Sequence, residues 1–311
     1  MPNPRVAVIV PCYNEAVAIP RVVEDFRAAL PDATVIVYDN NSGDGTAETA
    51  RAAGAMVRRE IRQGKGHVVR RAFADIEADI YVLVDGDGTY DATCAPAMVA
   101  LLIEERLDMV TGTRISDAAG AYRPGHRLGN RVLTGLVQSV FGAGVSDMLS
   151  GYRVFSRRFV KSFPALAAGF ETETEFTVHA LELRLPVGEL PTPYRERPQG
   201  SASKLHTIRD GIRILRTIVV LVKEERPLAF FCTAAAALLL AGIALVVPVV
   251  VEFFASGLVP RLPTAVLAMG MVLLSFLSFA CGLILDSVAR GRKEMKRLAY
   301  LRTAAVEAGD G

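Results

Sequence analysis

An apolar run passes directly into two aspartates in Tyr81-Val82-Leu83-Val84-Asp85-Gly86-Asp87, residues 81–87 of the chain. A short apolar run rich in β-branched residues is typical of a buried strand, and a glycine directly after it favours a tight turn. We therefore predict a strand over 80–84 whose carboxyl end carries Asp85 and Asp87.

Two further polar clusters follow apolar runs in the same way. Pro11-Cys12-Tyr13-Asn14-Glu15 comes after the run 6–10, and Asp39-Asn40-Asn41-Ser42-Gly43-Asp44-Gly45-Thr46 comes after the run 34–38. Parallel strands end at one edge of a sheet, and α/β proteins bind ligands beyond that edge. The three clusters are therefore expected to build one crevice.

The rest of the N-terminal 200 residues alternates in the same manner. Further strands are predicted over 55–59 and 109–112, and helical stretches lie at about 20–30, 46–53, 65–78 and 94–106. Apolar strands that alternate with helices predict an α/β domain with a mostly parallel sheet.

Several protein classes are excluded by what the chain lacks. No GxGxxG follows the first strand, and Gly64-Lys65-Gly66 lacks P-loop spacing, so neither a dinucleotide dehydrogenase nor a Walker-type ATPase is indicated. The formal net charge is only +2 and the basic residues are spread out, which disfavours nucleic acid as a partner. The four cysteines form no CxxC pair, so neither a zinc site nor a disulfide framework is expected.

The three clusters offer what a nucleotide diphosphate needs: a carboxylate for a base N–H, backbone amides near phosphate, and oxygen ligands for a cation. Asp85 and Asp87 flank a glycine and can approach one cation, and oxygen ligands favour Mg²⁺ or Mn²⁺. Such a cation would offset charge on a departing nucleoside diphosphate. The alternatives are an acidic surface turn or a helix cap for this pair and an Asx turn for Asp39, which is compatible with a binding role.

Two long segments near the C-terminus, 228–251 and 262–285, contain no charged residue. As a helix each spans roughly 36 Å, against a bilayer hydrocarbon core of about 30 Å, so we predict two transmembrane helices. Basic residues cluster on the two flanks of this pair of segments, whereas the linker 252–261 between them carries a single basic residue, Arg261. This bias predicts a multi-pass cell-membrane protein whose catalytic domain and both termini are cytoplasmic.

Two basic segments have amphipathic patterns. Residues 208–226 combine an apolar stripe with five basic residues and run straight into the first apolar segment, which favours a helix lying in the headgroup plane. Residues 128–140 repeat apolar side chains every four residues, with Arg127 and Arg131 on another face. For this second segment, an ordinary core-facing helix is an equal alternative.

The clusters carry a family resemblance. Together, 10–15, 38–46 and 84–87 resemble the family-2 inverting glycosyltransferases of the GT-A fold, and within them the polyprenyl-phosphate sugar synthases related to dolichol-phosphate mannose and glucose synthases. Further matches are Ser146-Asp147, Ser150-Gly151-Tyr152-Arg153, Phe170-Glu171-Thr172-Glu173 and Gly200-Ser201-Ala202-Ser203-Lys204-Leu205. The resemblance covers about residues 5–226, and two C-terminal helices occur in many such enzymes.

The chain also departs from the family pattern. Gly88-Thr89 stands where many relatives have Leu-Gln, so a glutamine metal ligand is missing. The Gln-x-x-Arg-Trp signature of processive polysaccharide synthases is absent, and the chain contains no tryptophan, which disfavours polymerisation.

The resemblance implies transfer of one sugar, with inversion, from a nucleotide diphosphate sugar to a polyprenyl (undecaprenyl or dolichyl) phosphate. The donor could be UDP-glucose, UDP-N-acetylglucosamine or GDP-mannose; overall likeness favours a UDP-sugar. A phosphate monoester with a second pKa of about 6 is mostly dianionic at neutral pH and hardly needs a base. Asp147, which the resemblance nominates as base, is therefore expected to orient or tune charge.

The candidate residues fall into four groups. The catalytic candidates are Asp87 and Asp147, and the metal ligands are Asp85 and Asp87. The candidates for binding the nucleotide sugar are Pro11, Tyr13, Asn14, Glu15, Asp39, Asn41, Ser42, Lys65, Asp85 and Gly86. Because arginine binds phosphate through a planar fork and lysine as a point charge, the candidates for the acceptor phosphate are Arg131, Arg153 and Lys204.

The predicted organisation has four parts: a GT-A-like catalytic domain (1–205), a juxtamembrane helix (206–227), a two-helix anchor (228–286) and a basic cytoplasmic tail (287–311). Three alternatives remain: a family-2 enzyme with a non-polyprenyl acceptor, a GT-A-like nucleotidyltransferase, and an inactive membrane scaffold. The first needs no basic interfacial helix, the second needs no anchor, and the third would tolerate loss of the strand-end acids. The oligomeric state is left open, a homo-oligomer included.

Overall fold

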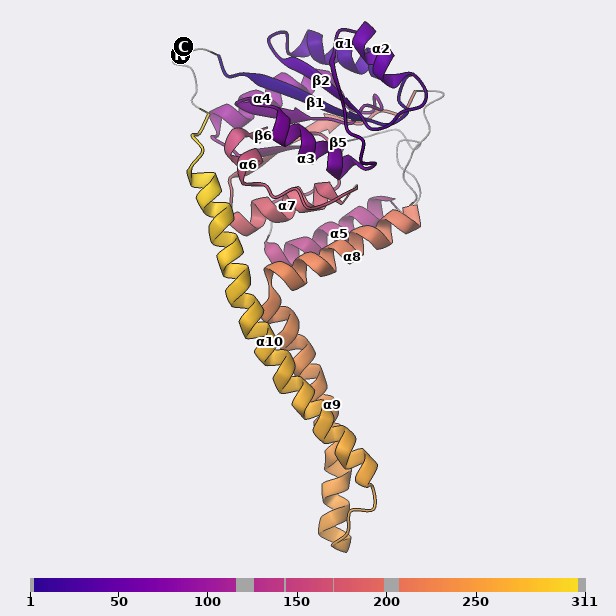
Figure 1. Ribbon diagram of the computed structural model, residues 1–311, viewed down its shortest axis with the longest axis vertical. Coiled ribbons are helices and arrows are strands. Elements are labelled where there is room, and N and C mark those ends of the chain that lie inside the picture. Colours follow the sequence, from indigo (N-terminus) through magenta and orange to yellow (C-terminus); the bar gives the residue numbers. More distant parts are fainter. Residues whose placement is uncertain (1–2, 116–125, 143, 170, 199–206, 307–311) are drawn as a thin grey trace. The chain divides into compact units, whose positions relative to one another are not determined.

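The computed structural model describes residues 3–115, 126–142, 144–169, 171–198 and 207–306 (Figure 1). The chain divides into two compact units. The α/β unit comprises residues up to 217 together with those from 295 onward, and the helical unit comprises 218–294.

A seven-stranded sheet with the order β3-β2-β1-β4-β6-β5-β7 forms the centre of the α/β unit. The strands are β1 (Val6–Cys12), β2 (Thr34–Asp39), β3 (Met56–Arg59), β4 (Ile80–Leu83), β5 (Met109–Ile115), β6 (Arg153–Ser156) and β7 (Val187–Pro193). Only β6 runs antiparallel to its neighbours, so the prediction of a mostly parallel sheet is confirmed. The five predicted strands are β1 to β5; the sequence did not indicate β6 and β7.

Helices cover both faces of this sheet because successive residues of each buried strand point to opposite sides. Val8 and Val10 of β1 pack in a core with α1, α2 and α4, whereas Ala7 and Ile9 pack in a core with α3, α6 and α7. These helices are α1 (Ile19–Ala29), α2 (Thr46–Ala52), α3 (Lys65–Asp75), α4 (Ala95–Glu104), α6 (Arg157–Ser162) and α7 (Thr172–Leu183). A short 3₁₀ turn, Ala92–Cys94, leads into α4.

The strand register places the three polar clusters at one edge of the sheet. Cys12 of β1 pairs with Asp39 of β2, and Ile9 of β1 pairs with Leu83 of β4. The segments that follow β1, β2 and β4 therefore leave the sheet side by side, as the sequence predicted.

Helix α5 (His126–Phe141) contacts α7. Its Val137 and Phe141 are buried, which fits the core-facing alternative for this segment. The side chains of residues 126–132 and 136, which include Arg131, lie outside the described part of the chain.

The C-terminal end of α10 (Leu262–Leu301) belongs to the α/β unit. The Tyr300 hydroxyl donates a hydrogen bond to Asp108 at 2.9 Å, and the Lys296 ammonium pairs with Glu182 at 2.8 Å. Asp108 is fully buried and also accepts from Arg158, whose guanidinium lies over the Tyr300 ring. The segment described from sequence as a basic tail thus continues α10 to Leu301, and its residues from 295 onward belong to the α/β unit.

The helical unit contains α9 (Pro227–Ser256) and most of α10, two helices long and apolar enough to cross a membrane. Buried small residues recur every seven positions: Ala235 and Gly242 on α9, and Ala268, Ser275, Gly282 and Ala289 on α10. The Ser275 hydroxyl donates to the Ala235 carbonyl at 2.8 Å. Small residues allow close backbone approach, the usual means of packing membrane helices.

Candidate active site

The first two clusters interlock through their backbones and side chains. The Asn14 N–H donates to the Ser42 hydroxyl at 2.9 Å, and the Gly43 N–H donates back to the Asn14 side chain at 2.8 Å. The Ser42 N–H donates to Asp39 at 3.3 Å. Asn14 has a φ of 54°, a left-handed conformation that asparagine tolerates. The structure therefore brings these predicted residues together at the ends of β1 and β2.

Asparagine side chains fasten these loops to the segment after β3. Asn40 is buried; its amide donates to the carbonyls of Glu60 and Arg62 at 2.8 and 2.7 Å. Asn41, a predicted donor-binding residue, donates to the Ile61 carbonyl at 2.8 Å. Its side chain is thus engaged in holding the loop, a role the sequence did not indicate.

Residues 11 and 13 lie at the rim of the site. Pro11 is half-buried, and Tyr13 is 40% exposed. Gly86 packs against β1: a Cβ there would stand 2.4 Å from the Cys12 sulfur, so only glycine fits. This close approach brings the third cluster, with Asp85 and Asp87, beside the first.

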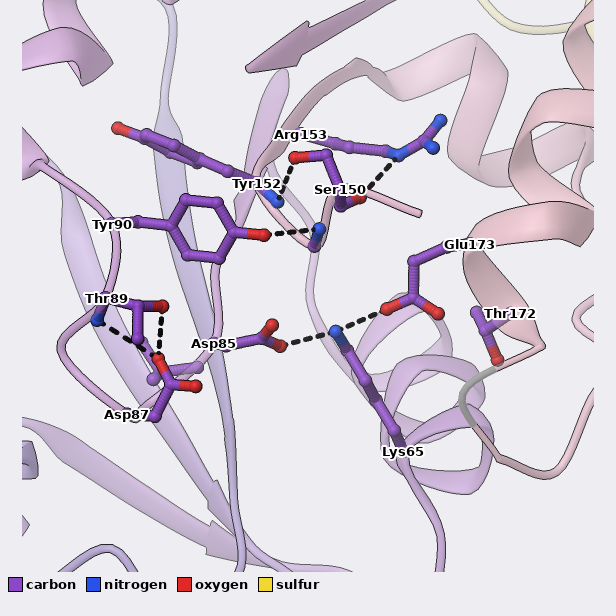
Figure 2. Close-up of polar contacts among 12 residues, drawn as sticks. Lys65, Asp85, Asp87, Thr89, Tyr90, Ser150, Tyr152, Arg153, Thr172 and Glu173 are labelled. Carbon is purple, nitrogen blue, oxygen red and sulfur yellow. Dashed lines mark hydrogen bonds and ion pairs between the residues drawn. The ribbon is translucent and has the colours of Figure 1, made fainter. Parts of the chain in front are cut away.

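The buried ammonium group of Lys65 contacts the Asp85 carboxylate (Figure 2). Lys65, the first residue of α3, donates to Asp85 and, at 2.5 Å, to Glu173 in the first turn of α7. Side-chain exposure is 6% for Lys65, 5% for Glu173 and 29% for Asp85. Lys65 was predicted to contact the nucleotide sugar, which stays a prediction; in this geometry its ammonium is directed at two carboxylates and positions Asp85.

Burial and charge act in opposite directions on this bridge. Burial by itself would lower the pKa of Lys65, but Asp85 and Glu173 together raise the pKa of that ammonium above its ordinary value. Burial raises the pKa of Glu173, partly opposed by Lys65. Lys65 therefore stays charged, and its charge is shared between the two carboxylates.

Asp87 is held on both carboxylate oxygens. Its Oδ1 accepts from the Thr89 N–H at 3.1 Å and from the Thr89 hydroxyl at 2.6 Å (Figure 2). Its Oδ2 pairs with the Arg197 guanidinium at 2.6 Å. Burial raises the pKa of Asp87, and the negative charge of Asp85 adds to the effect. Arg197 was missed from the sequence because a single arginine in the charged stretch 195–197 carries no pattern.

The acidic pair fits a hard divalent cation. Both ligands are carboxylates, and the Asp85 Oδ2 receives no hydrogen bond from the part of the chain that the structure describes. A Cβ at Gly151 would stand 2.4 Å from this oxygen, so the glycine leaves it room. Within the described ranges, no three acidic, histidine or cysteine residues form a metal cage. A cation here would complete its shell with diphosphate oxygens and water, as Mg²⁺ commonly does.

Asp147 is engaged by arginine. Its two oxygens accept from the Arg114 guanidinium at 2.8 and 2.7 Å, and the Arg114 N–H adds a contact of 3.2 Å. The guanidinium also lies over the Tyr194 ring, 5.6 Å from its centroid. Because a bidentate pair fixes both groups, this contact favours the orienting role expected for Asp147 over that of a base.

Arg153, a predicted ligand of the acceptor phosphate, lies in the interior of the α/β unit. Its side chain is fully buried, and its guanidinium donates to the carbonyls of Ser150 and Met148 at 3.1 and 2.6 Å. Burial lowers the pKa of Arg153 to about 10. This arginine therefore braces the loop before β6, with its guanidinium directed at backbone carbonyls. Of the other two acceptor candidates, Lys204 and the Arg131 side chain lie outside the described part of the chain.

The fold and the acidic sheet edge are those of an α/β enzyme that binds its ligand at the carboxyl ends of the strands. Residues 7–163 match the family described as Glycosyl transferase family 2, and the chain belongs to this family. It is therefore a glycosyltransferase, as the motifs predicted.

Two relatives from Haloferax volcanii extend the match. Glycosyltransferase AglJ is 35% identical over 305 residues, covering 97% of this chain and 100% of the relative. A dolichyl-phosphate hexose transferase is 30% identical over 220 residues, covering 71% of this chain and 95% of the relative. Among solved structures, glucosyl-3-phosphoglycerate synthase from Mycobacterium tuberculosis superposes with a TM-score of 0.60 at 23% identity, over 70% of this chain and 80% of that one. The predicted GT-A-like fold is confirmed.

Proposed function

We propose that this protein transfers one sugar from a nucleotide diphosphate sugar to a polyprenyl phosphate at the cytoplasmic face of a membrane, with inversion. The observation that carries the proposal is the covalent order of the chain. A glycosyltransferase unit runs through an amphipathic helix, α8 (Thr207–Glu225), directly into two helices apolar enough to span a bilayer. An acceptor anchored in a bilayer can meet its enzyme only at the membrane surface.

The donor side of the proposal rests on the acidic sheet edge. Asp85 and Asp87 would hold Mg²⁺ or Mn²⁺, which would offset charge on the departing nucleoside diphosphate. Crystals of glucosyl-3-phosphoglycerate synthase contain Mn²⁺ with UDP-glucose and Mg²⁺ with UDP, which supports a divalent cation and a UDP-sugar for this related fold. The loops at 11–15 and 39–46 would bind the base and ribose.

The acceptor side rests on α8. Its predicted apolar stripe includes Ile212, Leu215 and Val219, which are 63%, 46% and 48% exposed, whereas Ile214 and Ile218 on another face are buried. Three apolar side chains with about half or more of their surface exposed, on a helix carrying basic residues, suit the headgroup region of a bilayer. The similarity to a dolichyl-phosphate hexose transferase supports the same class of acceptor.

The chain's own residues would contribute mainly by positioning. A dianionic acceptor phosphate already carries nucleophilic oxygens, so the enzyme has to align it with the sugar and stabilise the leaving group. Lys65 and Glu173 would hold the Asp85 carboxylate, and Thr89 would hold that of Asp87. Asp147 would fix the orientation of the Arg114 guanidinium.

The direct test is incubation of the full-length purified protein with radiolabelled nucleotide sugars and undecaprenyl phosphate, followed by organic extraction. We expect label in the organic phase with at least one donor. Asp87→Asn should lower that signal at least about a hundredfold, since it removes charge at the leaving group. Excess EDTA should abolish it, and full activity in EDTA would refute the metal.

A parallel reaction with 3-phosphoglycerate tests a soluble phosphorylated acceptor, the kind recorded for the similar synthase. Transfer only to that compound would refute the lipid acceptor while leaving the glycosyltransferase intact. Arg131→Ala and Lys204→Ala test the remaining acceptor candidates: each should weaken the response to lipid concentration far more than UDP binding measured by calorimetry. If the activity of both variants depends on lipid concentration as in the wild type, Arg131 and Lys204 are surface charges without a role in acceptor binding.

A further inference from the structure

Arg197 joins two of the polar clusters through buried acids. Its guanidinium lies 2.6 Å from Oδ2 of Asp87 and 3.6 Å from Oε1 of Glu15. The side chains of these acids are only 7% and 8% exposed, whereas that of Arg197 is 25% exposed. A long, partly exposed cation therefore caps two carboxylates that water barely reaches.

The polar clusters around this arginine are strongly acidic. Burial raises the pKa of the Cys12 thiol, and the charges of Glu15, Asp39, Asp85 and Asp87 raise it further. Lys65 is already shared between Asp85 and Glu173, so Asp87 depends on another cation. In the described part of the chain, Arg197 is the cation that pairs with Asp87.

The contact also occupies a particular oxygen. Oδ1 of Asp87 already accepts two hydrogen bonds from Thr89, so Oδ2 is the oxygen left for a further ligand. The guanidinium lies on this oxygen. A divalent cation that bound Asp87 through Oδ2 and the arginine would therefore exclude each other.

We propose that Arg197 is a placeholder for the divalent cation. It neutralises Asp87 when no donor is bound, and the cation must displace it. The inference rests on the proposed metal site at Asp85 and Asp87. It follows that metal alone binds poorly, whereas metal together with a nucleoside diphosphate binds well, because the diphosphate supplies anionic oxygens that compensate the displaced guanidinium. The placeholder thus makes metal binding depend on the donor.

The test measures Mn²⁺ binding to the full-length protein from the electron paramagnetic resonance signal of free Mn²⁺, with and without UDP. Arg197→Gln should bind Mn²⁺ alone at least about tenfold more tightly than the wild type, since an adjacent cation shifts carboxylate equilibria by roughly one to three powers of ten. The gain in Mn²⁺ affinity caused by UDP should shrink by the same factor. Arg195→Gln is the matched control: Arg195 lies two residues away, pairs with Asp91 at 2.5 Å, and should leave both quantities unchanged.

Two results would overturn the placeholder, and they differ. If UDP promotes Mn²⁺ binding in the wild type but Arg197→Gln binds Mn²⁺ alone no more tightly, the metal site stands and Arg197 does not compete for it. If the wild type binds no Mn²⁺ even with UDP, or binds it as well after Asp87→Asn, the metal site fails and the placeholder fails with it. Far-ultraviolet circular dichroism of each variant shows that it is folded.

Discussion

The buried bridge at Lys65 yields the sharpest test of the site's construction. Lys65→Met removes an ammonium that is 6% exposed and leaves Asp85 and Glu173 facing each other without a cation. Removing one partner of a buried pair costs about 3–5 kcal/mol because the remaining charge is uncompensated. Glu173 can recover part of this by taking up a proton. We therefore expect a loss of about 3 kcal/mol in unfolding free energy at neutral pH.

The pH dependence of this loss has a definite sign. Burial already raises the pKa of Glu173, and loss of Lys65 raises it further. A carboxyl group whose pKa is higher in the folded than in the unfolded protein favours folding at low pH, and that contribution is lost as pH rises through the folded pKa. The deficit of Lys65→Met should therefore shrink as the pH is lowered.

The chain offers a matched control in Lys161, which pairs with Glu77 at 2.5 Å. These side chains are 26% and 53% exposed, so Lys161→Met should cost less than about 1 kcal/mol. Because the protein contains no tryptophan, urea unfolding is best followed by hydrogen exchange of the β1 and β4 amides, which report on the α/β unit alone.

An equal loss in the two lysine variants would refute the reasoning, because the buried bridge would then be worth no more than a surface pair. A second change tests the cause. Glu173→Gln in the Lys65→Met background removes the uncompensated charge and should restore about 1–2 kcal/mol. If it restores nothing, Glu173 is not the source of the loss.

Three further predictions concern other parts of the chain. Tyr300→Phe removes a hydrogen bond to the buried Asp108 carboxylate and should cost about 2 kcal/mol, read from faster exchange of β5 amides; unchanged exchange would mean that the end of α10 does not stabilise this unit. Burial, aided by Lys296, lowers the pKa of His179 to about 3. Between about pH 6.5 and 3 only the unfolded chain binds this proton. The unfolding free energy should therefore fall by about 1.4 kcal/mol for each unit by which the pH is lowered, and His179→Gln should remove this contribution. An identical slope in the variant contradicts a neutral histidine in the folded protein. Ser256→Cys, in a background without the four native cysteines, should react with an impermeant thiol reagent from outside intact cells, whereas labelling only after permeabilisation would reverse the predicted topology.

Local patterns were enough to predict five strands of the sheet and the edge at which the three polar clusters meet. Strands β1, β2 and β4 are continuous apolar runs, and in a parallel sheet such runs must end together. The two apolar helices could also be predicted from sequence, because an uncharged run long enough to cross a membrane is visible in the chain itself. Strands β6 and β7 were missed: β6 is only four residues long, and β7 contains a glycine and two prolines.

Only the tertiary structure decided which charges meet. Lys65 and Glu173 lie 108 residues apart, and the approach of α3 to α7 puts one ammonium between two carboxylates. Arg197 reaches Asp87 from beyond β7, and Tyr300 reaches Asp108 from the end of the second apolar helix. Arg153 has the side chain of a phosphate ligand, yet its place on β6, an interior strand of the sheet, buries it. Hydrophobic periodicity indicates which face of its own helix or strand a residue occupies. Its partners depend on strand order and helix packing, which no local pattern contains.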